Sequence, residues 1–192
     1  MCGITGWVDF DRDLRGERPI VQAMTDTMAL RGPDAEGIWI TRHAAFGHRR
    51  LSVIDLEGGV QPMIVEEVGR VLATITYSGE VYNYRELRTE LSAAGHRFRT
   101  VSDTEVVLRA YLEWGPDFVE RLNGMYAFAI WDDRSEELLL VRDRVGIKPL
   151  YYHPTPGGVL FGSEPKAILA HPQASRTIDA AGLCELFAGV KT

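Results

Sequence analysis

Cysteine is scarce in this sequence of 192 residues, in which only Cys2 and Cys184 occur. Two cysteines without paired spacing fit neither a disulfide framework nor a zinc site, and the five histidines show no metal-like spacing. No apolar run approaches the roughly 20 residues that a membrane span needs. The N-terminus also lacks the basic and then apolar layout of a secretory signal. We therefore expect a cytoplasmic protein with no metal site and no membrane partner.

Positive charge is also in deficit, since the formal net charge is −6 at pH 7. Nucleic acid and anionic membranes would repel such a chain, so neither is expected as a partner. Hydrophobic residues make up 45% and charged residues 25%, which is typical of a globular protein. The length is sufficient for one domain with a well-covered core. Composition thus excludes several partners without indicating an activity.

Apolar runs and turn residues predict a chain with more strands than helices. The expected strands are Gly3–Phe10, Gly37–Thr41, Ala44–Ile54, Val71–Tyr77, Met125–Trp131, Leu138–Val141, Leu150–Tyr152 and Val159–Phe161. The expected helices are Pro19–Leu30, Tyr84–Ala94, one that begins at Ser102, Pro165–Leu169 and Ala180–Phe187. Because strands and helices do not alternate singly, we expect layered antiparallel sheets rather than a doubly wound parallel sheet.

Three helix ends carry local signals. Gly32 follows the end expected for the first helix, and Gly95 follows the second. Ser102 and Glu105 stand three residues apart before an apolar run, which is the pattern of a capping box. This pattern predicts that the third helix begins there.

Cys2 is a candidate nucleophile because removal of Met1 would place an α-amine beside its thiol. An unperturbed α-amine has a pKa of about 7.7–8.0, close to the value of about 8.5 for a thiol. A neutral amine can therefore accept the thiol proton and act as the general base. The alternative is a small buried residue at the start of a strand. Met1 and Cys2 alone would favour the buried structural residue over the nucleophile. The choice between these two interpretations of Cys2 therefore depends on the other motifs.

Eight further motifs follow Met1–Ile4 in order along the chain. They are Arg31–Asp34, Gly47–Asp55, Gln61–Met63, Tyr77–Tyr84, Ser102–Val106, Asn123–Ala129, Arg142–Tyr152 and Gly162–Ala167. Any one of them is weak, but the ordered series closely resembles the N-terminal domain of glutamine-hydrolysing asparagine synthetases. These enzymes are class II glutamine amidotransferases with an N-terminal-nucleophile hydrolase fold. The resemblance implies an α+β fold, a four-layer αββα sandwich of mostly antiparallel sheets, and Cys2 as nucleophile.

The resemblance also implies roles in binding L-glutamine. Arg50 would hold the α-carboxylate, for which a guanidinium fork is well suited, and its neighbour Arg49 is then expected to face solvent. The backbone around Leu51 and Val53 would line the pocket.

Two acidic residues are expected at the α-ammonium of glutamine. Asp103 would accept hydrogen bonds from it, and Glu80 would help to hold it. Asp103 also has a plainer interpretation, as a first-turn carboxylate stabilised by the helix dipole, and both roles are compatible.

Ser78 is the main departure from the family pattern. The family usually has asparagine before Gly79, and the asparagine amide and the glycine N–H together form the oxyanion hole. Loss of one such donor costs about 2.7–4 kcal/mol. Ser78, or a water that it holds, could replace the amide. Alternatively, glutaminase activity is weak and ammonia is the practical nitrogen source. We favour the first alternative because the other substrate-binding positions are retained.

The family pairs this domain with a C-terminal synthetase domain that uses ATP and Mg²⁺. Its Ser-Gly-Gly-x-Asp-Ser signature does not occur here. We expect residues 1–192 to be a glutaminase domain that is truncated near its C-terminal end and has no cofactor of its own. Its expected partners are L-glutamine and the synthetase domain, and a homodimer is left open.

Arg142–Tyr152 is expected to form a strand, a turn at Gly146 and another strand, facing the partner domain and without a catalytic role.

Three other functions stay open at this point. Amino-sugar and purine amidotransferases share the initial Cys-Gly-Ile but differ in their arginine motifs. Enzymes similar to asparagine synthetase can amidate other carboxylates, a choice made by the other domain. A module that only binds glutamine, or stabilises a synthetase partner, is favoured slightly by Ser78 and disfavoured by Cys2.

Overall fold

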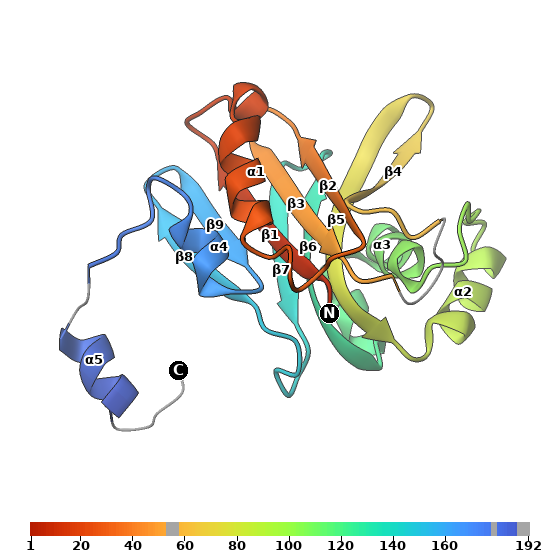
Figure 1. The fold of residues 1–192 in the computed structure, drawn as a ribbon. Coiled ribbons are helices and arrows are strands. Elements are labelled where there is room, and N and C mark those ends of the chain that lie inside the picture. The colour runs from red at the N-terminus through yellow and green to blue at the C-terminus, as the bar shows by residue number, and fades with distance from the viewer. Residues whose placement is uncertain (53–57, 178–179, 188–192) are drawn as a thin grey trace.

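Two antiparallel sheets form the centre of the molecule (Figure 1). The computed structural model describes residues 1–52, 58–177 and 180–187. The first sheet contains β1 (Gly3–Asp9), β2 (Ala35–Ile40), β3 (Ala44–Arg50), β8 (Tyr151–Thr155) and β9 (Gly158–Gly162), in the order β2-β3-β1-β9-β8. The second contains β4 (Met63–Glu67), β5 (Arg70–Val81), β6 (Gly124–Asp132) and β7 (Glu137–Arg142), in chain order.

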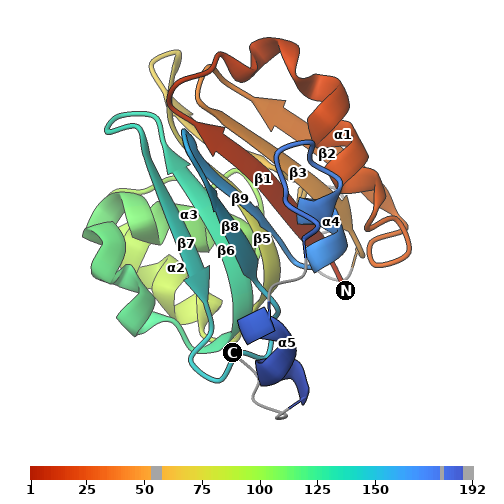
Figure 2. The ribbon, with the colours of Figure 1, turned by 90° about the vertical axis from the view of Figure 1, so that its left-hand side faces the viewer.

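Helices cover the outer faces of both sheets. The helical segments are η1 (Leu14–Gly16), α1 (Arg18–Asp26), α2 (Tyr84–Ala93), α3 (Asp103–Trp114), η2 (Gly115–Arg121), α4 (Pro165–Leu169) and α5 (Ala180–Phe187). Figure 2 shows α1 and α4 on the outer side of the first sheet and α2 and α3 on that of the second, and Figure 1 shows α5 apart from both sheets. The predicted α+β, four-layer αββα fold is confirmed. No helix in the described ranges is long and apolar enough to cross a membrane.

The two sheets divide the core into three apolar layers. The layer between the sheets is made by Ile4, Val8, Ala44, Phe46, Ala127, Ala129, Trp131 and Phe161. Outside the first sheet, Trp7 and Leu160 pack against Val21 and Met24 of α1 and Ile168 of α4. Outside the second sheet, β5 and β6 pack against α2 and α3. Both faces of each sheet are therefore buried, which explains why the central strands are apolar nearly throughout.

The first helix ends earlier than predicted. It stops at Asp26 rather than Leu30, and the next backbone bonds join residues three apart, from the Met28 N–H to the Thr25 carbonyl and from the Ala29 N–H to the Asp26 carbonyl. Thr25 Oγ1 donates to the Val21 carbonyl and Thr27 Oγ1 to the Met24 carbonyl, each at 2.7 Å. Such local bonds compete with continuation of a helix. Gly32 therefore lies in a turn beyond the helix, where a Cβ atom would be 2.3 Å from the Arg49 backbone.

The capping box at α3 forms only in part. Ser102 is the N-cap, and its Oγ accepts from the Thr104 N–H at 3.1 Å. Glu105 does not return to the Ser102 N–H. It accepts instead from the N–H groups of Arg99 and Thr100, at 3.0 and 2.7 Å, and from the Arg109 side chain at 3.1 Å. The predicted helix start is correct, and Glu105 joins the preceding loop to the helix.

Candidate active site

Cys2 lies just before β1, the central strand of the first sheet, and is held from both sheets. Its carbonyl accepts from Arg31 Nε at 2.7 Å and from the Ser78 hydroxyl at 2.8 Å. Its thiol lies against Leu51, with Sγ 3.4 Å from the backbone nitrogen and 3.5 Å from the carbonyl oxygen. Arg31 belongs to the turn after α1, and Ser78 lies on β5. The start of the chain is thereby fixed between the two sheets.

A cavity of about 250 Å³ opens beside Cys2. Seven of the eight residues predicted for the site line it, namely Cys2, Arg50, Leu51, Ser78, Gly79, Glu80 and Asp103. The eighth, Val53, lies outside the described residues. The remaining lining residues are Met1, Gly59, Gln61, Tyr77, Ser102, Thr104, Met125 and Lys148. Residues dispersed over more than 100 positions of sequence thus meet around one thiol.

Arg50 ends β3 and is buried at the cavity, whereas Arg49 faces the other side of the strand. Arg49 Nη1 forms an ion pair with Glu36 on the neighbouring strand β2, its register partner. The Arg49 side chain is 15% exposed, so the expectation that it faces solvent was wrong. Alternation along a strand separates the two arginines, and of these two it is Arg50 that lines the cavity.

Asp103 is the first residue of α3 and is only 3% exposed. Its Oδ2 accepts from the Tyr77 hydroxyl at 2.8 Å and from the Val81 N–H at 3.1 Å. Burial raises the pKa of this carboxyl above its usual value, although the two hydrogen bonds act in the opposite direction. Burial, followed by the charge of Asp103, raises the pKa of Tyr77 well above 10. The tyrosine is therefore a permanent donor that orients the carboxylate.

Gly79 follows Ser78 on β5 and meets the neighbouring strand β6 closely. A Cβ atom at position 79 would lie 2.4 Å from the Met125 carbonyl oxygen and 2.7 Å from Tyr126 Cα. Only glycine fits this place without backbone movement. Glu80, the next residue, is half-buried at the cavity wall.

Gln61 and Lys148 are lining residues to which the sequence interpretation assigned no role. The Gln61 amide bonds to both backbone groups of Tyr77, donating to the carbonyl at 3.0 Å and accepting from the N–H at 2.6 Å. Lys148 reaches the cavity from the loop between β7 and β8. That loop was predicted to have no catalytic role. Both residues belong to motifs of the ordered series, which is the signal that could have marked them.

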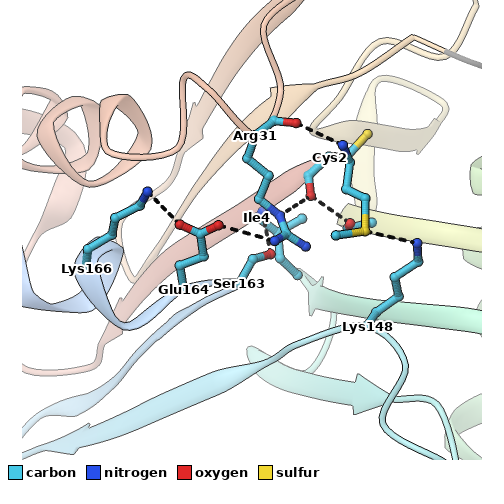
Figure 3. A network of polar contacts seen from close by, with 9 residues as sticks. Cys2, Ile4, Arg31, Lys148, Ser163, Glu164 and Lys166 are labelled. Carbon is cyan, nitrogen blue, oxygen red and sulfur yellow. Dashed lines mark hydrogen bonds and ion pairs between the residues drawn. The ribbon is translucent and has the colours of Figure 1, made fainter.

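A polar network supports the N-terminal segment from behind (Figure 3). Arg31 Nη1 lies 3.3 Å from Glu164 Oε1, and Glu164 also pairs with Lys166 at 2.7 Å. Ser163 bonds to Ile4 twice, since its Oγ accepts from the Ile4 N–H at 3.0 Å and its N–H donates to the Ile4 carbonyl at 2.8 Å. The motifs at Arg31 and Gly162–Ala167 thereby hold the residues on either side of Cys2.

A metal ion has no evident place among these groups. Within the described ranges, no cluster of three or more histidine, cysteine, aspartate or glutamate side chains could hold one.

Two sheets between helical layers, with a thiol before the central strand facing a cavity, define the class of N-terminal-nucleophile hydrolases. The profile described as "Glutamine amidotransferase domain" matches residues 1–192, and the chain belongs to this family. The fold agrees with a solved structure of glutamine phosphoribosylpyrophosphate amidotransferase from B. subtilis complexed with ADP and GMP. The TM-score is 0.70 at 19% identity, over 88% of this chain and 43% of that one.

Curated relatives include asparagine synthetases. Asparagine synthetase (glutamine-hydrolyzing) 3 of Bacillus subtilis (strain 168) is 51% identical over 187 residues, which cover 97% of this chain and 30% of the relative. Asparagine synthetase B (glutamine-hydrolyzing) of Escherichia coli (strain K12) is 39% identical over 170 residues, covering 88% of this chain and 30% of the relative. The chain thus spans about a third of the length of these relatives.

Proposed function

We propose that the chain hydrolyses L-glutamine to glutamate and ammonia with Cys2 as the nucleophile. The observation that carries this proposal is the convergence of seven predicted site residues on the cavity beside the Cys2 thiol. Family membership supports the substrate, because glutamine is the nitrogen donor from which the domain takes its name.

Glutamine would bind through the two ends of its amino-acid group. Arg50, buried at the cavity, is placed to hold the α-carboxylate. Asp103, with Oδ2 fixed by Tyr77 and Val81, would accept from the α-ammonium together with Glu80. The backbone near Leu51 and Val53 would line the side-chain part of the pocket. This orientation directs the carboxamide toward the thiol.

The reaction would begin after Met1 is removed. The α-amine of Cys2 takes the thiol proton, and the thiolate attacks the carboxamide carbon. The Gly79 N–H, together with Ser78 or a water that it holds, would stabilise the tetrahedral oxyanion. Its collapse breaks the C–N bond, and the α-ammonium returns the proton to the leaving ammonia. Water then hydrolyses the γ-glutamyl thioester and regenerates the thiol.

In a longer enzyme, this ammonia would serve a C-terminal synthetase domain that amidates aspartate with ATP and Mg²⁺. The names of the relatives at 51% and 39% identity support asparagine as the product. An enzyme that amidates another carboxylate is the alternative, since the acceptor would be chosen by that other domain. The cavity described here would need no cofactor for its own step.

Glutamate release by the purified chain tests the proposal. Cys2→Ala should reduce the rate to background, whereas Cys184→Ala, the matched change at the exposed cysteine, should leave it unchanged. The intact mass of the active chain should lack Met1, because a retained Met1 would block the α-amine. Equal rates for the wild type and Cys2→Ala would refute the proposal.

A further inference from the structure

Lys148 places a buried cation beside the N-terminus. The residue is 8% exposed, and its side chain lines the same cavity as Cys2. Its Nζ contacts the Met1 thioether, 3.6 Å from Sδ, and Figure 3 shows the side chain pointing to the N-terminal residues. No carboxylate within the described ranges forms an ion pair with it. A thioether is a weak acceptor and does not neutralise an ammonium.

The loop that carries Lys148 is held in one shape by its own polar groups. The Asp143 carboxylate accepts from the N–H groups of Ile147 and Lys148, at 2.8 and 2.9 Å. Arg142 donates to the carbonyls of Gly146 and Lys148, at 2.7 and 2.8 Å. Gly146 has a φ of +66°, which favours glycine. The hydrogen bonds to the N–H and the carbonyl of Lys148 therefore fix the position of its backbone.

Burial of an ammonium without a counter-ion costs free energy. The Met1 side chain is the group that Lys148 contacts, and it is absent from a chain whose N-terminus is Cys2. Lys148 then lines the cavity that it shares with Cys2, with its ammonium no longer in contact with a Met1 thioether. A positive charge in that cavity stabilises a thiolate. This effect favours the nucleophile after its proton has moved to the α-amine.

We propose that Lys148 is a positioning residue for hydrolysis, whose ammonium stabilises the Cys2 thiolate. This inference rests on the proposed glutaminase function. It gives the Arg142–Tyr152 motif a purpose at the site.

Alkylation of Cys2 by iodoacetamide at pH 7, in the chain lacking Met1, tests the charge without any substrate. Peptide mass spectrometry measures the rate of Cys2 alkylation relative to that of Cys184, an exposed thiol that serves as internal reference. Lys148→Met should slow Cys2 alkylation about tenfold relative to Cys184, and Lys148→Arg should restore most of the rate. Arg144→Gln is the matched control. This substitution also removes one positive charge from the loop, but Arg144 pairs with Glu120 at the surface.

Kinetics with glutamine complete the test. Lys148→Met should lower kcat by a similar factor and change KM less than twofold. An unchanged alkylation ratio, a rise in KM alone, or an equal effect of Arg144→Gln would overturn the proposal. If Lys148→Met does not fold, Lys148→Gln replaces it. If neither folds, Lys148→Arg decides: alkylation within about threefold of wild type supports the proposal, and a tenfold fall overturns it.

The two proposals fail in different ways. Slower alkylation in Lys148→Met, in a chain that hydrolyses no glutamine, would refute the glutaminase function and retain the electrostatic role. Full hydrolysis with an unchanged alkylation ratio would retain the glutaminase function and refute the role of Lys148.

Discussion

The Ser78 hydroxyl donates its proton to the Cys2 carbonyl. A hydroxyl has one proton, so this bond competes with donation to an oxyanion. Ser78 can serve the reaction only if it turns away from Cys2 or acts through a water. Arg31 Nε would remain on the Cys2 carbonyl in either case. The interpretation of Ser78 as a substitute for asparagine stays a prediction. The bond from its hydroxyl to the Cys2 carbonyl shows a second role, which is to position the backbone of the proposed nucleophile.

Ser78→Asn should therefore raise kcat for glutamine hydrolysis by about tenfold or more, because an amide can donate to the oxyanion through a second N–H. Steady-state glutamate release is the measurement. Ser78→Ala is the matched control, since it removes the hydroxyl without adding a donor, and it should not accelerate the reaction. If Ser78→Asn is no faster than wild type, the serine already fulfils the oxyanion role.

Residue types determined which parts of the site could be predicted. A second-position cysteine and an arginine suited to a carboxylate have recognisable chemistry, and the motif series located Cys2, Arg50 and Asp103. Tyr77 and Lys148 also belong to the motif series, but their residue types indicated no role at the site. A tyrosine in a strand is usually core, and a lysine after a turn is usually exposed, so only the three-dimensional contacts show that they reach the cavity.

At the scale of elements, β3 carries a neutral histidine into the layer between the sheets. His48 is 1% exposed, and its Nδ1 lies 3.2 Å from the Thr76 hydroxyl oxygen of β5. Burial, and then the charge of Arg50, lowers the pKa of His48 to about 3. Histidine in the unfolded chain takes up its proton near pH 6.5. Between these values the unfolded state binds more protons, so stability is lost as the pH falls.

His48 should make the free energy of unfolding fall by about 1.4 kcal/mol for each pH unit between pH 6 and pH 4. Urea unfolding at pH 6, 5 and 4 measures this slope. His48→Gln, which keeps a polar group near Thr76, should flatten it. Some slope should remain, because burial also lowers the pKa of His171, to about 4. Identical slopes in the variant and wild type would show that His48 is not the source.

Most elements were predictable because their signals are local, but their ends depend on side-chain bonds and on distant strands. The helices at Pro165–Leu169 and Ala180–Phe187 match the observed bounds. The strand β4 was missed because Met63–Glu67 is short and ends in two charged residues. Its pairing with β5 decides its conformation. The strand predicted at Ala44–Ile54 ends at Arg50. The last two residues of that prediction, Val53 and Ile54, lie outside the described residues.

At the scale of the whole molecule, α5 stands apart from the sandwich (Figures 1 and 2). The side chains of α5 that the structure describes are exposed, including Leu183 and Phe187. By contrast, α4 buries Ala167 and Ile168, and Ile168 packs in the cluster that contains Trp7. The two C-terminal helices therefore differ in their expected contribution to stability.

Ending the chain at Thr177 should change Tm by less than about 3 °C, since little apolar surface is re-exposed. Ending it at Gly162, which also removes α4, should lower Tm by about 5 °C or more through exposure of the Trp7 cluster. Differential scanning calorimetry measures both. Equal losses for the two truncations would mean that the segment 163–177, which contains α4, adds nothing to the stability.

The layered fold followed from the motif series, whereas the strand order could not be obtained from local pattern. β9 lies next to β1 although the two are separated by about 150 residues, with Thr5 opposite Gly162 and Trp7 opposite Leu160. Neither β1 nor β9 contains a local sequence signal that identifies the other as its partner strand. Long-range pairing of this kind is decided by burial of the whole sheet rather than by propensity.

This pairing has a consequence for synthesis on the ribosome. One edge of β1 stays unpaired until Gly158–Gly162 has emerged, roughly 10–30 s after the N-terminus at typical elongation rates. During that interval the first residues are not yet enclosed by the finished sheet. The removal of Met1 that the proposed function requires can therefore take place before β9 arrives, and it stays possible afterwards because Met1 is 55% exposed in the folded chain.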